Sequence, residues 1–438
     1  MIPVFAYPKE SDSLWKRLEH SPAEDFQTLQ NVQEILREVA TKGDAALLDY
    51  TRRFDAVELT PSTMRLDPER LASAWKSLPA DLKKALQHAK KRLITFHKEQ
   101  RRKSWTLRDT AGFKLSQRWS ALESAGLYVP GGIASYPSSV LMNAVPAQVA
   151  GVERIVAVTP PGNDARGSNA ATLGALHLMG ITEVYQVGGA QAVAALAYGT
   201  ETIRPVDIIV GPGNRYVAAA KKLVYGRVKI DMIAGPSEVL VVADESAPLP
   251  WIAADLLAQA EHDPVAQAIC VLVGRKDAKA LQKEVERQVK ASPRREILEQ
   301  SIPNHGAIIT VSKPEQALEI INRKAPEHLE LLMADAAAFA KQVRHAGSIF
   351  IGLHSVEAIG DYIAGPNHVL PTGGAARRFS PLSVQDFLKM TQLIECSPKG
   401  LKSTGADAAL LADFEGLPSH AESIRLRLTT PSTPESKG

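Results

Sequence analysis

Two polar residues three positions apart end an apolar segment that begins near Trp251. They are Gln259 and His262, and Asp263-Pro264 follows them. Residues three apart lie on one face of a helix, so the amide oxygen and an imidazole nitrogen could bind one metal ion. The plainer interpretation is a polar helix end that the Asp-Pro pair terminates. Two ligands do not complete a site, so the choice depends on the rest of the chain.

Asp361 and His420 could complete a metal site. Each lies beside glycine or proline in a turn-like stretch of sequence. Together with Gln259 and His262 they would provide two nitrogen and two oxygen ligands, a set that zinc accepts. Only Asp361 carries a negative charge, which leaves the site positive and open to further ligands. Such a site suits the orientation of a substrate better than the support of a fold.

Glu327-His328 is a second candidate for chemistry, at the predicted entrance to an apolar strand. A carboxylate and an imidazole there could act as paired general bases, because His titrates near neutral pH and burial raises the pKa of Glu. The alternative is a solvated Glu beside a hydrogen-bonded His. His368 lies close enough in sequence to Asp361 to support it, and His305 has no predicted role.

Three glycine-rich turns lie where a predicted strand is followed by a helix. In open α/β sheets ligands bind at the carboxyl ends of the strands, and helix N-termini there attract phosphate. A dinucleotide is therefore plausible, although no turn carries the full G-x-G-x-x-G pattern. Each turn could instead be an ordinary connection between strand and helix. The turns are residues 130–132, 188–191 and 211–214.

The elements that must position these residues alternate between strand and helix. From about Gly126 as far as Val224, short β-branched apolar runs alternate with Ala-rich helical segments. This alternation indicates a parallel sheet covered by helices. It resumes at residues 239–242 and continues to 349–351. Two such series, separated near residues 231–236, predict an α/β fold with two domains that face each other across a cleft.

The flanking segments follow other patterns. Helical periodicity runs through residues 26–104, 105–119 alternates like a hairpin, and the chain beyond Pro381 is helical and polar. The predicted divisions are an N-terminal arm (1–25), a first α/β domain (26–125 with 237–380), a second α/β domain on the cofactor side (126–236), a C-terminal helical segment (381–428) and a disordered tail (429–438).

Composition limits the class of protein. With 438 residues, 45% of them hydrophobic and 23% charged, the chain can form two domains with their own cores. A formal charge of +3 implies no bulk attraction to nucleic acid or to a membrane surface. Cys270 and Cys396 suggest neither a disulfide framework nor a thiolate zinc site, which fits a reducing cytoplasm. The sequence shows no export signal and no membrane-spanning run.

With these motifs the chain resembles the histidinol dehydrogenase family. The match runs through almost the whole chain, and only residues 21–33 follow the family loosely. The most specific motifs are residues 43–47, 96–97, 128–132, 143–147, 188–192, 210–214, 230–239, 258–264, 325–330 and 365–372. The resemblance implies an aldehyde-dehydrogenase-like pair of Rossmann-like parallel-sheet domains, with small N-terminal and C-terminal helical appendages.

The resemblance also implies roles for single residues. Glu327 and His328 would be the acid/base pair. The zinc ligands would be Gln259, His262, Asp361 and His420. The NAD contacts would be Tyr128, Gln191 and Asn214. Ser237 and Glu415 would hold the substrate, together with the base pair and the four zinc ligands.

The activity that the resemblance implies is the oxidation of L-histidinol to L-histidine with two NAD, the last steps of histidine biosynthesis. His328 would take the alcohol proton, Glu327 would activate water toward the aldehyde, and one zinc per subunit would orient the substrate. The family is a homodimer whose C-terminal segment reaches the partner's active site. Glu415 and His420 would therefore act across the interface.

Three other functions stay open from the sequence. A family relative could oxidise another small polar alcohol such as a sulfonated diol, but the Glu415 carboxylate suits a cationic amine and would repel a sulfonate. A Cys-dependent aldehyde dehydrogenase would need a reactive thiol, and Cys270 lies in an apolar strand that indicates a core residue. A metal-binding or nucleotide-binding protein without activity would turn over no alcohol.

Overall fold

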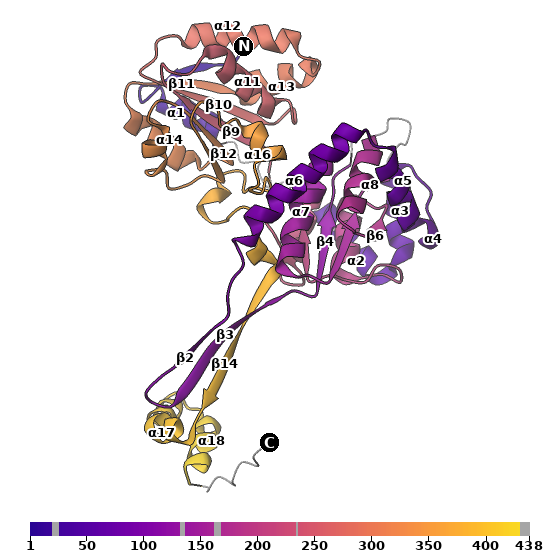
Figure 1. Ribbon diagram of the computed structural model, residues 1–438, viewed down its shortest axis with the longest axis vertical. Helices are drawn as coiled ribbons and strands as arrows, with labels where there is room; N and C mark the ends of the chain where they lie inside the picture. Colours follow the sequence, from indigo (N-terminus) through magenta and orange to yellow (C-terminus); the bar gives the residue numbers. More distant parts are fainter. Residues whose placement is uncertain (20–25, 132–135, 162–167, 234, 430–438) are drawn as a thin grey trace. The chain divides into compact units, whose positions relative to one another are not determined.

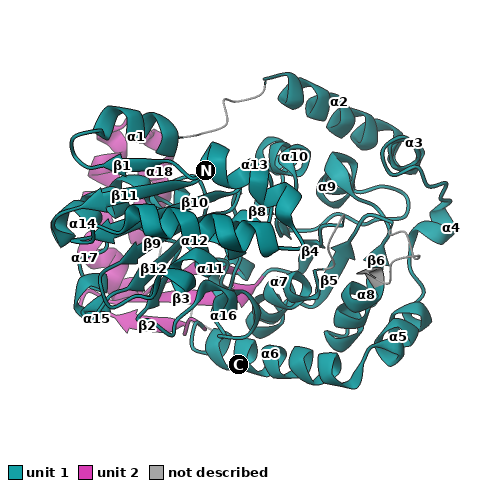
Figure 2. Ribbon diagram, turned by 90° about the horizontal axis from the view of Figure 1, so that it is seen from above, with its two compact units in different colours: residues 1–100, 122–387 teal, residues 101–121, 388–438 magenta. Residues whose placement is uncertain are grey.

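The computed structural model describes residues 1–19, 26–131, 136–161, 168–233 and 235–429. The chain divides into two compact units (Figure 2). The first contains residues 1–100 and 122–387, and the second contains residues 101–121 and 388–438. Predictions for Gly132 and for residues 20–25 and 430–438 lie outside the described residues.

A six-stranded parallel sheet carries most of the first unit's second half (Figure 1). Its central strands are buried along their whole length and mostly apolar, as expected for a parallel sheet that helices cover on both faces. The strands in spatial order are β1 (Val4–Ala6), β11 (Ala307–Val311), β10 (Gln267–Val273), β9 (Glu238–Ala243), β12 (His328–Leu332) and β13 (Ser348–Ile351).

Alternate residues of β9 point into two different cores. Val239 and Val241 join one core, and Leu240 and Val242 join the other. The first core is covered by α11 (Leu249–Ala260), α12 (Ala278–Ala291) and α13 (Arg295–His305). The second is covered by α1 (Ser11–Leu18), α14 (Pro314–Lys324) and α15 (Ala336–Ala340).

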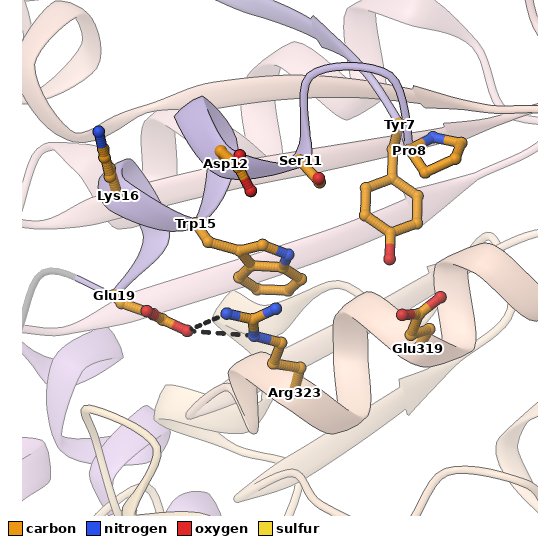
Figure 3. A pocket seen from close by; sticks show the side chains of 9 residues that line it. All are labelled: Tyr7, Pro8, Ser11, Asp12, Trp15, Lys16, Glu19, Glu319 and Arg323. Carbon is orange, nitrogen blue, oxygen red and sulfur yellow. Dashed lines mark hydrogen bonds and ion pairs between the residues drawn. The ribbon is translucent and has the colours of Figure 1, made fainter.

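The N-terminal segment is part of this sheet layer rather than a separate arm. β1 pairs with β11, and α1 buries Leu14, Trp15 and Leu18. Arg323 of α14 stacks on Trp15, with the guanidinium carbon 3.8 Å from the ring centre, and pairs with Glu19 (Figure 3). The described part of the predicted arm is therefore ordered by docking on the six-stranded sheet.

A five-stranded parallel sheet forms the other half of the first unit. Its spatial order is β6 (Glu183–Tyr185), β5 (Arg154–Val158), β4 (Ser124–Tyr128), β7 (Ile208–Val210) and β8 (Lys229–Ile230). The helices between these strands are α7 (Pro137–Ala150), α8 (Ser168–Leu178), α9 (Gly189–Tyr198) and α10 (Arg215–Val224). The two parallel sheets confirm the predicted α/β fold class.

The helices between residues 26 and 98 pack on this five-stranded half. They are α2 (Phe26–Lys42), α3 (Asp44–Asp55), α4 (Pro61–Met64), α5 (Pro68–Ser77) and α6 (Ala80–Lys98). The apolar face of α2 meets α9 and α10, while α5 packs on α8 and α6 on α7. The sequence predicted one domain that combines residues 26–125 with residues 237–380. The structure groups these helices with 126–236 instead, because that is where their buried faces find partners.

Three short elements follow β13 and complete the first unit, which ends at residue 387. They are α16 (Glu357–Tyr362), a 3-10 turn η2 (Ala375–Arg377) and a second 3-10 turn η3 (Val384–Phe387). Asn367, on the segment between α16 and η2, donates to the Met142 carbonyl of α7. Among the helices of the described segments, none is both long and apolar enough to cross a membrane.

The second unit is an antiparallel sheet with two helices. The hairpin predicted at 105–119 is confirmed as β2 (Trp105–Arg108) and β3 (Phe113–Ala121). The segment after Pro381 was predicted to be helical, and this is wrong for β14 (Leu388–Cys396), which pairs with β3 over nine residues. The pairing satisfies the backbone groups that face β3 and leaves β14 as an edge strand of the sheet. Two helices follow, α17 (Pro398–Phe414) and α18 (Pro418–Thr429).

Candidate active site

Glu327 and His328 lie at the amino end of β12. Lys324 ends α14, Ala325 takes a left-handed conformation with φ of 51°, and Pro326 then starts the extended segment. Both side chains are buried, with 6% and 4% of their surface exposed. Burial rules out the alternative of a solvated Glu at this position.

Glu238 at the start of the neighbouring strand β9 holds Glu327 on both sides. The Glu238 N–H donates to Glu327 Oε2 at 2.9 Å, and the Glu327 N–H donates to Glu238 Oε1 at 3.3 Å. Lys324 Nζ lies 2.5 Å from Glu238 Oε2, and the Gly373 N–H also reaches Glu238 Oε1, at 3.1 Å. Glu238 is thus a buried and fully paired support for the Glu327 carboxylate.

His328 is fixed in one tautomer by the same residue. Its Nδ1 lies 3.2 Å from the Glu238 carbonyl oxygen, which can only accept, so Nδ1 carries the hydrogen and Nε2 is the basic nitrogen. Nε2 is buried without a hydrogen-bond partner in the described chain and lies 3.8 Å from Asp361 Oδ1. Burial, with nearby His368 and His262, lowers the pKa of His328 to about 3. The imidazole is therefore neutral at neutral pH.

Burial also shifts the acids around His328. It raises the pKa of Glu327 well above its usual value, where the Glu238 and Asp361 charges add to the effect and the Glu238 N–H opposes it. Burial raises the pKa of Asp361 to about 6. Clustered acids and a base with displaced pKa values are typical of a functional site.

Glu357 is an acid of this site that the sequence reasoning missed. It lies one helical turn before Asp361 on α16, and its Oε1 is 3.6 Å from His328 Nδ1. Ligand atoms of His328, Glu357 and Asp361 all lie within 4.8 Å of one another. The spacing of four residues from Asp361 was the available signal, because such residues share a helix face.

Gln259 is buried and its amide lacks hydrogen-bond partners within the described chain, as expected of a metal ligand. It lies in the last turn of α11 with 0% of its surface exposed, and neither amide atom has a hydrogen-bond partner among the described residues. A buried amide without partners costs free energy, so a bound group that its oxygen contacts would relieve that cost. Gln259 thus fits the donor set of a zinc site.

His262 and His368 both lie near His328. His262 is exposed in the turn after α11, where its N–H donates to the Gln259 carbonyl at 3.2 Å. The chain turn therefore continues past the helix and keeps the two predicted ligands together. His368 Nδ1 donates to the Asp361 carbonyl at 2.9 Å, which gives His368 the supporting contact that its sequence position suggested.

The sites on the five-stranded sheet lie at carboxyl ends of strands. Tyr128 ends β4 and is buried, and its hydroxyl accepts the Gly189 N–H at 3.0 Å. Gln191, in the first turn of α9, is buried with its Oε1 unpartnered within the described chain. Asn214 caps α10, accepting the N–H groups of Tyr216 and Val217. The three predicted cofactor contacts thus lie at the ends of β4, β6 and β7 of one sheet, of which only β4 and β7 are direct neighbours.

The remaining predicted residues divide between the units. Ser237 immediately precedes β9 and is partly exposed. Glu415 caps the end of α17 and His420 lies in the first turn of α18, both exposed and both in the second unit. Of the four predicted metal ligands, the first unit therefore contains Gln259, His262 and Asp361.

Two parallel α/β sheets with a buried carboxylate–imidazole pair and a strand-end turn suited to a dinucleotide describe a dehydrogenase. The family model of histidinol dehydrogenase matches residues 18–428, and the chain belongs to that family. It is 53% identical over 397 residues to the histidinol dehydrogenase of Thermosynechococcus vestitus, covering 91% of this chain and 92% of that protein. The corresponding protein of Geobacillus kaustophilus is 50% identical over 397 residues, covering 91% and 93%.

A solved structure supports the same assignment. The crystal structure of histidinol dehydrogenase from Elizabethkingia anophelis matches with a TM-score of 0.89 and 35% identity, covering 98% of both chains. The chain is therefore an oxidoreductase, and the alternative of a relative that oxidises a different alcohol is not favoured. Cys270 is fully buried and burial strongly raises the pKa of its thiol, which confirms the core residue and disfavours a thiolate mechanism.

Proposed function

We propose that this protein oxidises L-histidinol through L-histidinaldehyde to L-histidine with two NAD⁺, at the end of histidine biosynthesis. The observation that carries the proposal is the bracing of both bases by Glu238, which leaves His328 Nε2 free at the amino edge of the six-stranded sheet. In support, Asp361 on α16 lies 3.8 Å from that nitrogen, and Gln259 and His262 lie at and just after the end of α11.

The metal ligands in this proposal are Gln259, His262 and Asp361, with His420 from a second copy of the chain. The unpartnered Gln259 amide and the mixed nitrogen and oxygen donors fit zinc. When bound, zinc would supply a Lewis acid that anchors the imidazole and amine of the substrate. Orientation is the main benefit, because two hydride transfers need the same carbon held in place.

The first oxidation uses His328 as base. Nε2 takes the proton of the alcohol while a hydride passes to the nicotinamide ring, giving the aldehyde and NADH. In the second oxidation Glu327, as its carboxylate, takes a proton from water, which adds to the aldehyde carbon. The hydrate anion formed in this way gives a second hydride to a second NAD⁺ and becomes the carboxylic acid, which loses its proton to solvent to give the carboxylate. Substrate contacts would come from Ser237 and Glu415 as well as from the metal ligands.

The cofactor would bind at the strand ends of the five-stranded sheet. Tyr128 ends β4, Gln191 lies in the first turn of the helix that follows β6, and Asn214 caps the helix that follows β7. The helix N-termini of α9 and α10 at these turns favour phosphate groups. We further propose a cytoplasmic homodimer that shares its active sites, in which Glu415 and His420 act on the other copy.

The experiment is NAD⁺ reduction by the purified, zinc-loaded protein with L-histidinol, counting NADH formed per alcohol consumed. We expect two NADH per alcohol and histidine as product. One NADH per alcohol would limit the protein to the first step. No reduction by folded, metal-bound protein would refute the proposal.

A further inference from the structure

A buried ion pair holds the glycine turn that follows β7. Lys221 Nζ lies 2.5 Å from Asp231 Oδ1, and the two side chains are 3% and 1% exposed. Lys221 Nζ also donates to the Gly211 carbonyl at 2.9 Å, and Asp231 Oδ2 accepts the Gly211 N–H at 2.8 Å. Both backbone polar groups of Gly211 are therefore bound by one Lys221–Asp231 pair.

Gly211, held in this way, leaves no room for a side chain. Gly211 has φ of 114°, a conformation that favours glycine, and a Cβ there would lie 2.2 Å from the Tyr128 carbonyl oxygen. Its backbone thus rests against the end of β4. Asn214 follows three residues later and begins α10. A shift of Gly211 would displace two of the three proposed cofactor contacts together.

The pair joins three elements around the turn. Lys221 lies on α10, and Asp231 follows the short strand β8 and also accepts the Met232 N–H at 2.6 Å. A buried ion pair is weak support for stability, since an apolar pair of equal volume often does as well. What the charges add here is geometry, because one bonds the N–H and the other the carbonyl of Gly211, and so they fix the two peptide groups that flank it.

We propose that Lys221 and Asp231 are positioning residues for the cofactor, holding the 211–214 turn in the conformation that receives the dinucleotide. This inference rests on the proposed function, because it takes the turn as part of the NAD site. A turn fixed before binding loses little conformational freedom when the ligand arrives, and affinity rises accordingly. Neither residue touches the cofactor in this proposal; both act through Gly211.

The test uses the full-length, zinc-loaded protein with Lys221→Met and Asp231→Asn combined, so that no unpaired charge stays buried. We expect the Kd and KM for NAD⁺ to rise about tenfold, while the KM for the alcohol and the zinc content stay unchanged. Lys222→Met is the matched control, because Lys222 is the exposed neighbour on the same helix. It should leave NAD⁺ binding at the wild-type level.

A folded double variant that binds NAD⁺ as tightly as the wild type would overturn the inference. If the double variant does not fold, hydrogen exchange of the wild-type Gly211 amide decides instead. We expect that amide to be protected without NAD⁺ as strongly as those of β7, and rapid exchange would overturn the inference. Wild-type protein that binds no NAD⁺ would refute the proposed function. The exchange rate of the Gly211 amide would still show whether Lys221 and Asp231 hold the turn.

Discussion

Glu238 and Glu327 exchange hydrogen bonds at the start of two neighbouring strands: each backbone N–H donates to the other's carboxylate, at 2.9 and 3.3 Å. The exchange brings two buried acids side by side, and Lys324 supplies the compensating charge, 2.5 Å from Glu238. The geometry of the proposed water-activating base therefore depends on a residue outside the base pair.

Lys324→Met should destabilise the protein. It would leave the Glu238 carboxylate buried without its cation, and removing one partner of a buried pair costs about 3–5 kcal/mol. Urea unfolding at neutral pH measures the loss. Lys341→Met, at an exposed lysine, is the control and should change stability little. A Lys324→Met variant as stable as the control would contradict the role of Lys324 as the cation that compensates Glu238.

His262→Ala should lose the metal and the activity while the chain stays folded. The side chain is exposed in the turn after α11, so its removal leaves no cavity in the core. Metal content after dialysis and circular dichroism give the two readings. His354→Ala removes another exposed histidine and should keep the metal. Stoichiometric zinc in His262→Ala would defeat the assignment of His262 as a ligand.

Glu327→Gln should slow the second oxidation more than the first. Water activation belongs only to the aldehyde step, and loss of a general base costs about 100- to 10,000-fold in rate. Single-turnover reduction of NAD⁺ starting from the alcohol and from the aldehyde separates the two steps. Equal losses in both would make Glu327 a support for the site rather than a base.

Asp255→Asn should change how stability depends on pH. Burial raises the pKa of Asp255 from 3.8 to about 6, with Glu330 sharing its hydrogen bond. An acid with a raised pKa in the folded state favours folding below the unfolded pKa, and that contribution is lost as pH rises from about 4 to about 6. The variant should therefore be more stable at pH 7, by about 3 kcal/mol. Unfolding curves at pH 4 and pH 7 test this, and an unchanged difference between them would contradict it.

The residues of the site were predictable where type and spacing carry the signal. Glu327-His328 is a dipeptide, and Gln259 and His262 share one turn. Glu238 and Lys324 were not predictable as partners, because only the pairing of β9 with β12 brings residues so far apart in sequence together.

The fold was predicted at the level of class and missed in its connections. Periodicity identified the parallel sheets, but it does not say which sheet a helix covers. The prediction therefore grouped α2 with residues 237–380, whereas α2 packs on α9 and α10 of the five-stranded half. β14 was missed because its exposed face carries polar residues among apolar ones, and its partner β3 lies far away in the sequence. Tertiary pairing decided both cases.

The Gln259 amide, which has no hydrogen-bond partner among the described residues, affects how stable the protein is in the cell. A ligand that binds only the folded chain stabilises it by mass action, and here the ion would also satisfy a buried amide oxygen. The metal-free chain should therefore melt earlier and be degraded sooner. We expect zinc supply to set the abundance of this protein as well as its turnover.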